Sequence, residues 1–253
     1  MDTSKYIGKC IYCGSVEDLS DEHIIPYGLA GNLTLTKASC KKHRDITSIF
    51  EGEVLRKQFI LVRSTQNYPT RHKSRRPKYF EFAVNKETKK IPVQDCPAMF
   101  MMLGFLQPRC ISNYGYDKGI YATGYSTHEA NFQEFREKYD VQNFSYSQDL
   151  GSNFARLVAK IAYCAAVYKY GLDSFAEVNI LPSIIGDKDD IGYWVGCPTD
   201  YKREADVPPK ESCLHKIVIF EKNKQIAVTV RLFASFQTPE YLAIVGKLKG
   251  KAE

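Results

Sequence analysis

Soft metal ligands occur as two closely spaced pairs near the beginning of the chain. Two residues separate Cys10 from Cys13, and two residues separate Cys40 from His43. A tight turn aims both side chains of such a pair at one ion, and zinc prefers four tetrahedral ligands drawn from thiolate and imidazole. The spacing therefore predicts a structural Zn²⁺ ion held by all four residues.

The segment between the two pairs is longer than the spacer of a simple zinc ribbon. It contains the sequence DEHIIP at residues 21–26, in which Glu22 directly precedes His23. An imidazole with a pKa of about 6.5 suits a general base near neutral pH. A carboxylate is a ligand that Mg²⁺ and Mn²⁺ prefer. The pair has residue types consistent with hydrolysis, whereas His23 alone, followed by Ile24 and Ile25, would more simply be a core or supporting histidine.

Residues 8–58 resemble the HNH, or ββα-metal, endonucleases that carry a zinc knuckle. The resemblance rests on the two ligand pairs, the Glu-His-Ile-Ile-Pro sequence, a Gly-Asn loop, and a helix after the second pair. It implies that His23 is the general base that activates a water and that Glu22 binds a catalytic Mg²⁺ or Mn²⁺ ion. Two kinds of metal are thus implied, because the zinc ligands are soft and the catalytic ligand is hard.

Three positions decide how closely the site follows that family. Arg44 stands where the family commonly has a His or Asn metal ligand, and a guanidinium can instead contact a phosphate. Glu51 lies on the same face of the predicted helix and is the candidate for the second ligand of the catalytic ion. An exposed helix carboxylate is the alternative. Asn32 either braces the loop beside the site or forms a Gly-Asn turn.

A basic segment follows the predicted helix. No acidic residue occurs between Glu53 and Glu81. The cationic side chains of this interval are those of Arg56, Lys57, Arg63, Arg71, Lys73, Arg75, Arg76 and Lys78. Such a segment has the charge to follow a phosphate backbone, which predicts binding of DNA, with RNA as a possible partner. A solvated basic loop is the alternative interpretation.

Composition limits the class of protein. A hydrophobic content of 44% in 253 residues is that of a globular protein, not a disordered one. The chain lacks an apolar run long enough for a membrane span, and its start lacks a signal-peptide core. Three of the eight cysteines belong to the predicted zinc site, and the odd, widely scattered remainder suits reduced thiols in the cytoplasm better than a disulfide framework. That remainder is Cys96, Cys110, Cys164, Cys197 and Cys213.

The pattern predicts an α+β protein in three parts. Residues 1–60 form the zinc-stabilised ββα-metal module, residues 61–94 a basic connector with a hairpin, and residues 95–253 an α+β domain. In that last domain we expect one long helix against an antiparallel sheet. The expected strands are 24–26, 33–36, 78–84, 90–93, 215–220, 225–236 and 241–248, and the expected helices are 41–61, 97–106, 128–139 and 153–170.

The function predicted from the sequence is metal-dependent cleavage of DNA by an endonuclease. By family association, such an enzyme would act in defence or restriction. Two alternatives stay open. One is a zinc-stabilised protein that binds nucleic acid without cleaving it. The other is a nuclease controlled by a partner protein, a second copy of the chain, or a ligand bound to residues 95–253, a region without a recognisable motif.

Overall fold

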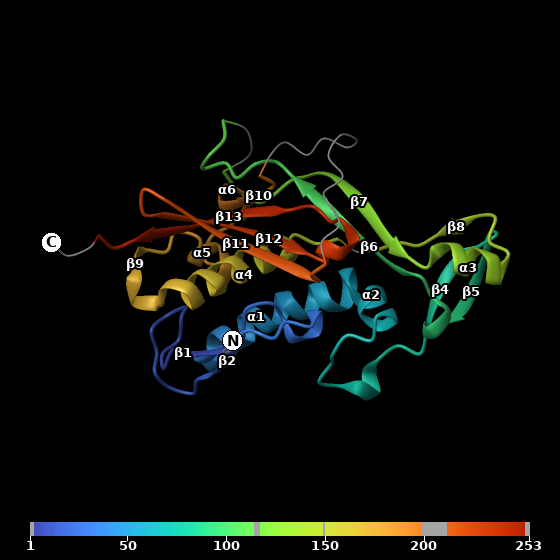
Figure 1. Cartoon of the computed structure of the whole chain (residues 1–253), viewed down its shortest axis with the longest axis horizontal. Coiled ribbons are helices and arrows are strands. Elements are labelled where there is room, and N and C mark those ends of the chain that lie inside the picture. Colours follow the sequence, from blue (N-terminus) through green and yellow to red (C-terminus); the bar gives the residue numbers. More distant parts are fainter. Residues whose placement is uncertain (1–2, 114–116, 149, 199–211, 251–253) are drawn as a thin grey trace.

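The first unit of the molecule is a small sheet followed by a helix. The computed structural model describes residues 3–113, 117–148, 150–198 and 212–250 (Figure 1). Strand β3 (Thr34–Ser39) pairs with β1 (Ser4–Tyr6) in parallel and with β2 (Ser20–His23) in antiparallel orientation. Helix α1 (Lys41–Glu53) begins directly after β3. The expected order of strand, strand and helix is therefore found.

Two boundaries in this unit differ from the prediction. The sequence predicts a strand at 24–26, but β2 ends at His23 and the 3-10 turn η1 (Tyr27–Leu29) follows. Pro26 has no N–H to offer a sheet, so the chain leaves the ladder before it. The single helix predicted over 41–61 is interrupted by the π-helical turn η2 (Val54–Gln58), after which α2 (Ile60–Thr65) continues.

A second, separate unit lies at the end of the molecule opposite the C-terminus (Figure 1). Strand β4 (Tyr79–Val84) pairs with β5 (Glu87–Pro92) and β8 (Phe144–Ser145), and helix α3 (Phe132–Tyr139) packs on them. The predicted hairpin is confirmed, with a shorter turn formed by two residues at positive φ. The short turns η3 (Lys73–Arg75) and η4 (Val93–Asp95) flank this hairpin.

The predicted helix at 97–106 is wrong. This segment is strand β6 (Ala98–Phe105), which pairs with β7 (Ala122–Ala130). Nearly every residue of β6 is buried, so the sequence shows a continuous apolar run instead of the alternation that marks a half-exposed strand. The ladder of β7 also includes His128, which is why the helix predicted over 128–139 begins only at Phe132.

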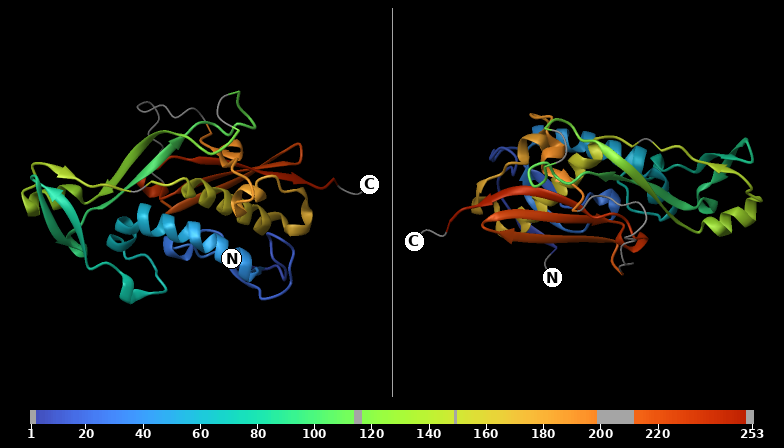
Figure 2. Two further views of the ribbon diagram at one scale, coloured as in Figure 1. Left: turned by 180° about the vertical axis from the view of Figure 1, so that it is seen from behind. Right: turned by 90° about the horizontal axis from the view of Figure 1, so that it is seen from above.

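The last part of the chain places one long helix against an antiparallel sheet, as predicted. Helix α4 (Asn153–Tyr170) lies between α1 and this sheet (Figures 1 and 2). The strand order is β10 (Val195–Gly196), β13 (Tyr241–Leu248), β12 (Gln225–Leu232) and β11 (His215–Lys222), and β9 (Phe175–Glu177) also pairs with β13. The short elements are η5 (Leu172–Ser174), α5 (Leu181–Ile185), α6 (Ile191–Trp194) and η6 (Ala234–Phe236).

One hydrophobic core joins the first and last parts of the chain. The ring of Phe59 lies 6.0 Å from that of Phe154 and 5.0 Å from that of Phe233, measured between centroids. Helix α4 is covered on both sides and is therefore buried around almost its whole circumference. The boundary at residue 60 stays a prediction about folding units, but the residues on its two sides share this core. None of the described helices is both long and apolar enough to cross a membrane.

Candidate metal centre and basic pocket

The four predicted zinc ligands come together as the spacing requires. One ligand atom from each of Cys10, Cys13, Cys40 and His43 lies within 4.8 Å of all the others. The Sγ atoms of Cys13 and Cys40 are 3.8 Å apart, and Nδ1 of His43 is 3.2 Å from Sγ of Cys40 and 3.7 Å from Sγ of Cys10. Tetrahedral zinc with Zn–S bonds of about 2.3 Å separates two sulfurs by about 3.8 Å. The cluster therefore fits Zn²⁺, with His43 binding through Nδ1.

Local backbone structure aims these ligands. Between Cys10 and Cys13 the chain turns back on itself, with the N–H of Gly14 donating to the carbonyl of Cys10 over 2.8 Å. Gly14 has a φ of 77°, a conformation that glycine adopts without the steric cost of a side chain. Cys40 is the N-cap of α1, and His43 follows in the first turn of that helix. The zinc cluster thus joins the β-sheet unit to the start of α1.

A buried lysine holds the two predicted catalytic carboxylates together. Nζ of Lys160, on α4, lies 2.7 Å from Oε1 of Glu22 and 2.9 Å from Oε1 of Glu51. It also donates to the backbone carbonyl of His23. Lys160 is completely buried. Burial alone would lower its pKa, but the two carboxylates outweigh burial and raise the pKa above its usual value. The lysine is therefore charged at neutral pH.

His23 lies at the end of β2 and faces a pocket. Its ring is 5.8 Å from that of Tyr27, measured between centroids. Burial lowers the pKa of His23 below 6.5, helped by the charges of Lys160 and Arg71, while Glu22 and Asp21 act in the opposite direction. The imidazole is therefore neutral at pH 7 and able to accept a proton.

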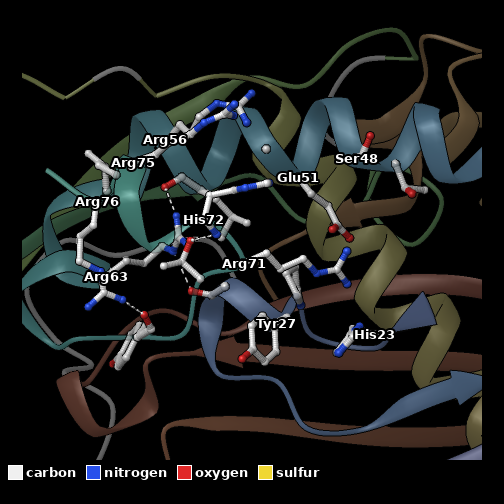
Figure 3. Close-up of a pocket in the computed structure, with 18 of the residues that line it drawn as sticks. His23, Tyr27, Ser48, Glu51, Arg56, Arg63, Arg71, His72, Arg75 and Arg76 are labelled. Atoms are coloured by element: carbon white, nitrogen blue, oxygen red, sulfur yellow. Dashed lines mark hydrogen bonds between the residues drawn. The ribbon is translucent and has the colours of Figure 1, made fainter. Parts of the chain in front are cut away.

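The pocket in front of His23 has a volume of about 470 Å³ and is strongly basic. Its acidic lining residues are Asp21, Glu22 and Glu51, and its arginines are Arg44, Arg56, Arg63, Arg71, Arg75 and Arg76. Figure 3 shows the Arg71 side chain pointing into the space between Glu51 and His23. A negatively charged group that enters the pocket meets guanidinium groups on the way to the histidine.

The predicted nucleic-acid-binding residues divide into two groups. Five of them, Arg56, Arg63, Arg71, Arg75 and Arg76, line the pocket, whereas Lys57, Lys73 and Lys78 are not part of its lining. The guanidinium of Arg63 is already occupied, because it donates to the carbonyls of Gly28 and Leu55. Arg76 likewise donates to Asn67 and to the carbonyl of Tyr68. Figure 3 shows Arg71 between His23 and the carboxylate of Glu51.

Two further predicted residues lie at the margin of the site. Arg44 lines the pocket and pairs weakly with Asp18, the Nη2–Oδ2 distance being 3.8 Å. Asn32 is exposed and lies outside the pocket lining. The backbone carbonyl of His23 is bound instead by Lys160. The role predicted for Asn32, in the loop beside the site, stays a prediction.

Lys160 is the functional residue that sequence reasoning missed. The sequence does contain a signal, because this lysine stands between Ala159 and Ile161 in a helix that is apolar on most of its surface. A charged side chain is almost never fully buried without a partner of opposite charge. Such a lysine predicts a buried carboxylate, but the sequence does not reveal which one.

Glu22 and Glu51 do not fit the expected catalytic divalent ion in this arrangement. The ammonium of Lys160 forms an ion pair with one oxygen of Glu22 and one of Glu51, and it donates a hydrogen bond to the carbonyl of His23. In the part of the chain that the structure describes, the Cys₃His cluster is the one group of three or more potential ligands close enough to share an ion. The position between the two carboxylates is taken by a lysine.

Comparisons with known protein families, with curated proteins and with solved structures find no match to this chain.

Proposed function

We propose that this chain hydrolyses phosphodiester bonds in nucleic acid, with DNA as the expected substrate and His23 as the general base. The observation that supports the proposal best is the position of His23, whose neutral imidazole faces a pocket lined by arginines. A phosphodiester carries a negative charge along its whole backbone, so an arginine-lined pocket attracts it. The resemblance of residues 8–58 to ββα-metal nucleases points to the same chemistry.

The proposed reaction uses groups that the pocket contains. His23 takes a proton from a water molecule, and the oxygen of that water forms a bond to phosphorus. The bond from phosphorus to the leaving oxygen breaks, and the leaving oxygen keeps the electron pair and takes a proton from solvent. Guanidinium groups, with Arg71 pointing toward the histidine, stabilise the negative charge that develops on the phosphate oxygens.

In this proposal Zn²⁺ has a structural role. The four ligands of its cluster are all protein side chains, and a zinc site closed in this way leaves no position for water or substrate. The ion would fix the turn before β2 and the start of α1, two elements that flank the pocket. It would therefore hold His23 in place without taking part in the reaction.

The experiment is cleavage of supercoiled plasmid by the purified, zinc-loaded protein beside His23→Ala. We expect wild-type protein to nick the plasmid and the variant to be slower by about a hundredfold or more, the usual contribution of a general base. Metal analysis and urea unfolding of both proteins check that zinc and fold are retained. Equal rates for the two proteins would contradict the role of His23.

A second candidate function is binding of nucleic acid without cleavage. Arg44 stands in place of a metal ligand, and Lys160 already occupies both carboxylates. Fluorescence anisotropy with a labelled DNA duplex and the matching RNA separates the two candidates. Tight binding with no cleavage of DNA or RNA under any metal condition would support the binding protein, and it would overturn the hydrolase.

A further inference from the structure

The positive charge between Glu22 and Glu51 comes from the protein itself, from the ammonium group of Lys160. Nζ of Lys160 forms ion pairs with one oxygen of each carboxylate, at 2.7 and 2.9 Å, and it donates a hydrogen bond to the carbonyl of His23. A divalent ion placed between the same two carboxylates would lie within a few ångström of this ammonium. Two positive charges at such a distance inside a protein repel each other strongly.

Lys160 is held inside the core. It belongs to the middle of α4 and is completely buried, as is Cys164 one turn further along the helix. An ammonium that left the two carboxylates would lie unpaired among apolar side chains, which is strongly unfavourable. The lysine is therefore a fixed feature of the site.

A catalytic divalent ion would balance the charge of the carboxylates and would also contact the phosphate. In this site Lys160 can perform the first task and Arg71 the second. Lys160 neutralises the carboxylates and binds the backbone of the histidine, but it is completely buried and does not reach substrate. Arg71 is exposed, and it points into the space between Glu51 and His23 (Figure 3). Burial lowers the pKa of His23 and the charge of Arg71 adds to that, whereas burial raises the pKa of Glu51 and the charge of Arg71 opposes the rise. A guanidinium in this position can contact a phosphate oxygen directly.

We propose that Lys160 is the resident cation of this site, in the place where a divalent ion is expected, so that cleavage needs no added Mg²⁺ or Mn²⁺. The proposal rests on the proposed hydrolytic function. It makes Lys160 a positioning residue, which acts through Glu22, Glu51 and the backbone of His23. It also predicts that the two carboxylates bind no divalent ion while the lysine is present.

The first test uses the wild-type protein and the variant Glu51→Gln, both loaded with zinc and freed of other metals. Cleavage is measured with Mg²⁺, with Mn²⁺ and with neither, and Mn²⁺ binding is followed by electron paramagnetic resonance. We expect wild-type rates to agree within about twofold across the three conditions. We also expect the two proteins to give the same Mn²⁺ titration. Cleavage that requires a divalent ion, together with Mn²⁺ binding that Glu51→Gln abolishes, would overturn the proposal.

The second test removes the charge with Lys160→Met, which keeps a long unbranched side chain. Two carboxylates without a cation should then gain one Mn²⁺ site, and the double variant Lys160→Met/Glu51→Gln should lose it. A purely structural lysine would leave Mn²⁺ binding unchanged, and that result would contradict the proposal. If Lys160→Met does not fold, wild type and Glu51→Gln still decide the question.

Failure of the proposed hydrolytic function would give a different result from failure of the proposal about Lys160. A wild-type protein that cleaves neither DNA nor RNA under any metal condition would overturn the hydrolytic function and metal-independent cleavage with it. The Mn²⁺ titrations need no activity, so they would still decide whether Lys160 keeps divalent ions away from the two carboxylates.

Discussion

At the scale of single residues, the candidate site is governed by the charge of one buried lysine. Glu51 is partly buried, and burial raises its pKa, while the charge of Lys160 acts in the opposite direction. Lys160 pairs with both Glu22 and Glu51, and Arg71 points into the space between Glu51 and His23 (Figure 3). These charged side chains depend on one another, so removal of one of them leaves a partner of opposite charge unpaired.

Lys160→Met is expected to destabilise the protein as well as to change its metal binding. Removal of one partner from a buried ion pair typically costs about 3–5 kcal/mol, because the charge left behind stays buried. Urea unfolding monitored by circular dichroism measures the difference from wild type. A loss smaller than about 1 kcal/mol would mean that water reaches the carboxylates.

Arg71→Ala tests the residue that we propose contacts a substrate phosphate. Arg71 is exposed, so we expect the variant to keep its stability and to lose kcat by about tenfold to a thousandfold, as for groups that stabilise transition-state charge. The control is Lys222→Ala, which removes an exposed positive charge from β11, outside the pocket lining. Steady-state cleavage kinetics compare the two variants. Equal effects would show that Arg71 contributes only to overall charge.

At the scale of elements, α4 links the turn that carries Cys10 and Cys13 to the common core. The hydroxyl of Tyr163 donates to the carbonyl of Ile11, within the turn that carries the first zinc pair. The ring of Tyr12 lies 5.5 Å from that of His43 and 6.0 Å from that of Tyr163, measured between centroids. The same helix therefore contacts both the zinc cluster, through Tyr163, and the glutamate pair, through Lys160.

Tyr163→Phe removes the link between α4 and the zinc turn without changing the shape of the ring. The buried carbonyl of Ile11 would lose this donor, so we expect a loss of about 1–3 kcal/mol in the free energy of unfolding. Tyr170→Phe serves as the matched control, because its hydroxyl contacts Glu221 at the surface over 3.4 Å. That variant should change stability by less than about 0.5 kcal/mol. Equal urea midpoints for both variants would contradict the prediction.

At the scale of the whole molecule, a half-buried histidine joins the C-terminal sheet to the segment beside the pocket. Nε2 of His215, on β11, lies 2.7 Å from the carbonyl of Leu29, and the N–H of Phe233 donates to Nδ1 over 3.1 Å. This arrangement requires the neutral ring, because Nδ1 accepts a hydrogen bond. Burial lowers the pKa of His215 to about 4, and the carbonyl of Leu29 only partly opposes it.

This histidine should make the fold less stable in mild acid. Between a pKa of about 6.5 in the unfolded chain and about 4 in the folded protein, only the unfolded state takes up the proton. The contribution of His215 to the free energy of unfolding is therefore present above about pH 6.5, and it is lost as the pH decreases toward 4. We expect His215 to contribute about 2 kcal/mol to the decrease between about pH 7.5 and pH 5. Urea unfolding at both pH values should show a smaller decrease in His215→Gln, which does not titrate.

Local patterns in the sequence predicted much of the fold. The long helix α4 and the strands β11 to β13 follow from periodicity and from turn residues, which act over short stretches of chain. Sequence periodicity did not predict strand β6. Its residues are buried on both faces, so the sequence lacks the alternation of apolar and polar residues that identifies a strand. The break in the first helix at η2 likewise follows from packing in three dimensions, where Phe59 joins the common core.

The sequence by itself determined the zinc cluster, because each ligand pair is set by a single turn and the four ligands lie within one short segment. It also determined that a histidine and basic residues occur near this cluster in the chain. Only the tertiary structure decided which arginines line the pocket and which cation Glu22 and Glu51 bind. Lys160 is distant from both acids in the sequence, and the packing of α4 against α1 brings them together. A buried charge selects its partner by proximity in the folded core, and no local pattern encodes that proximity.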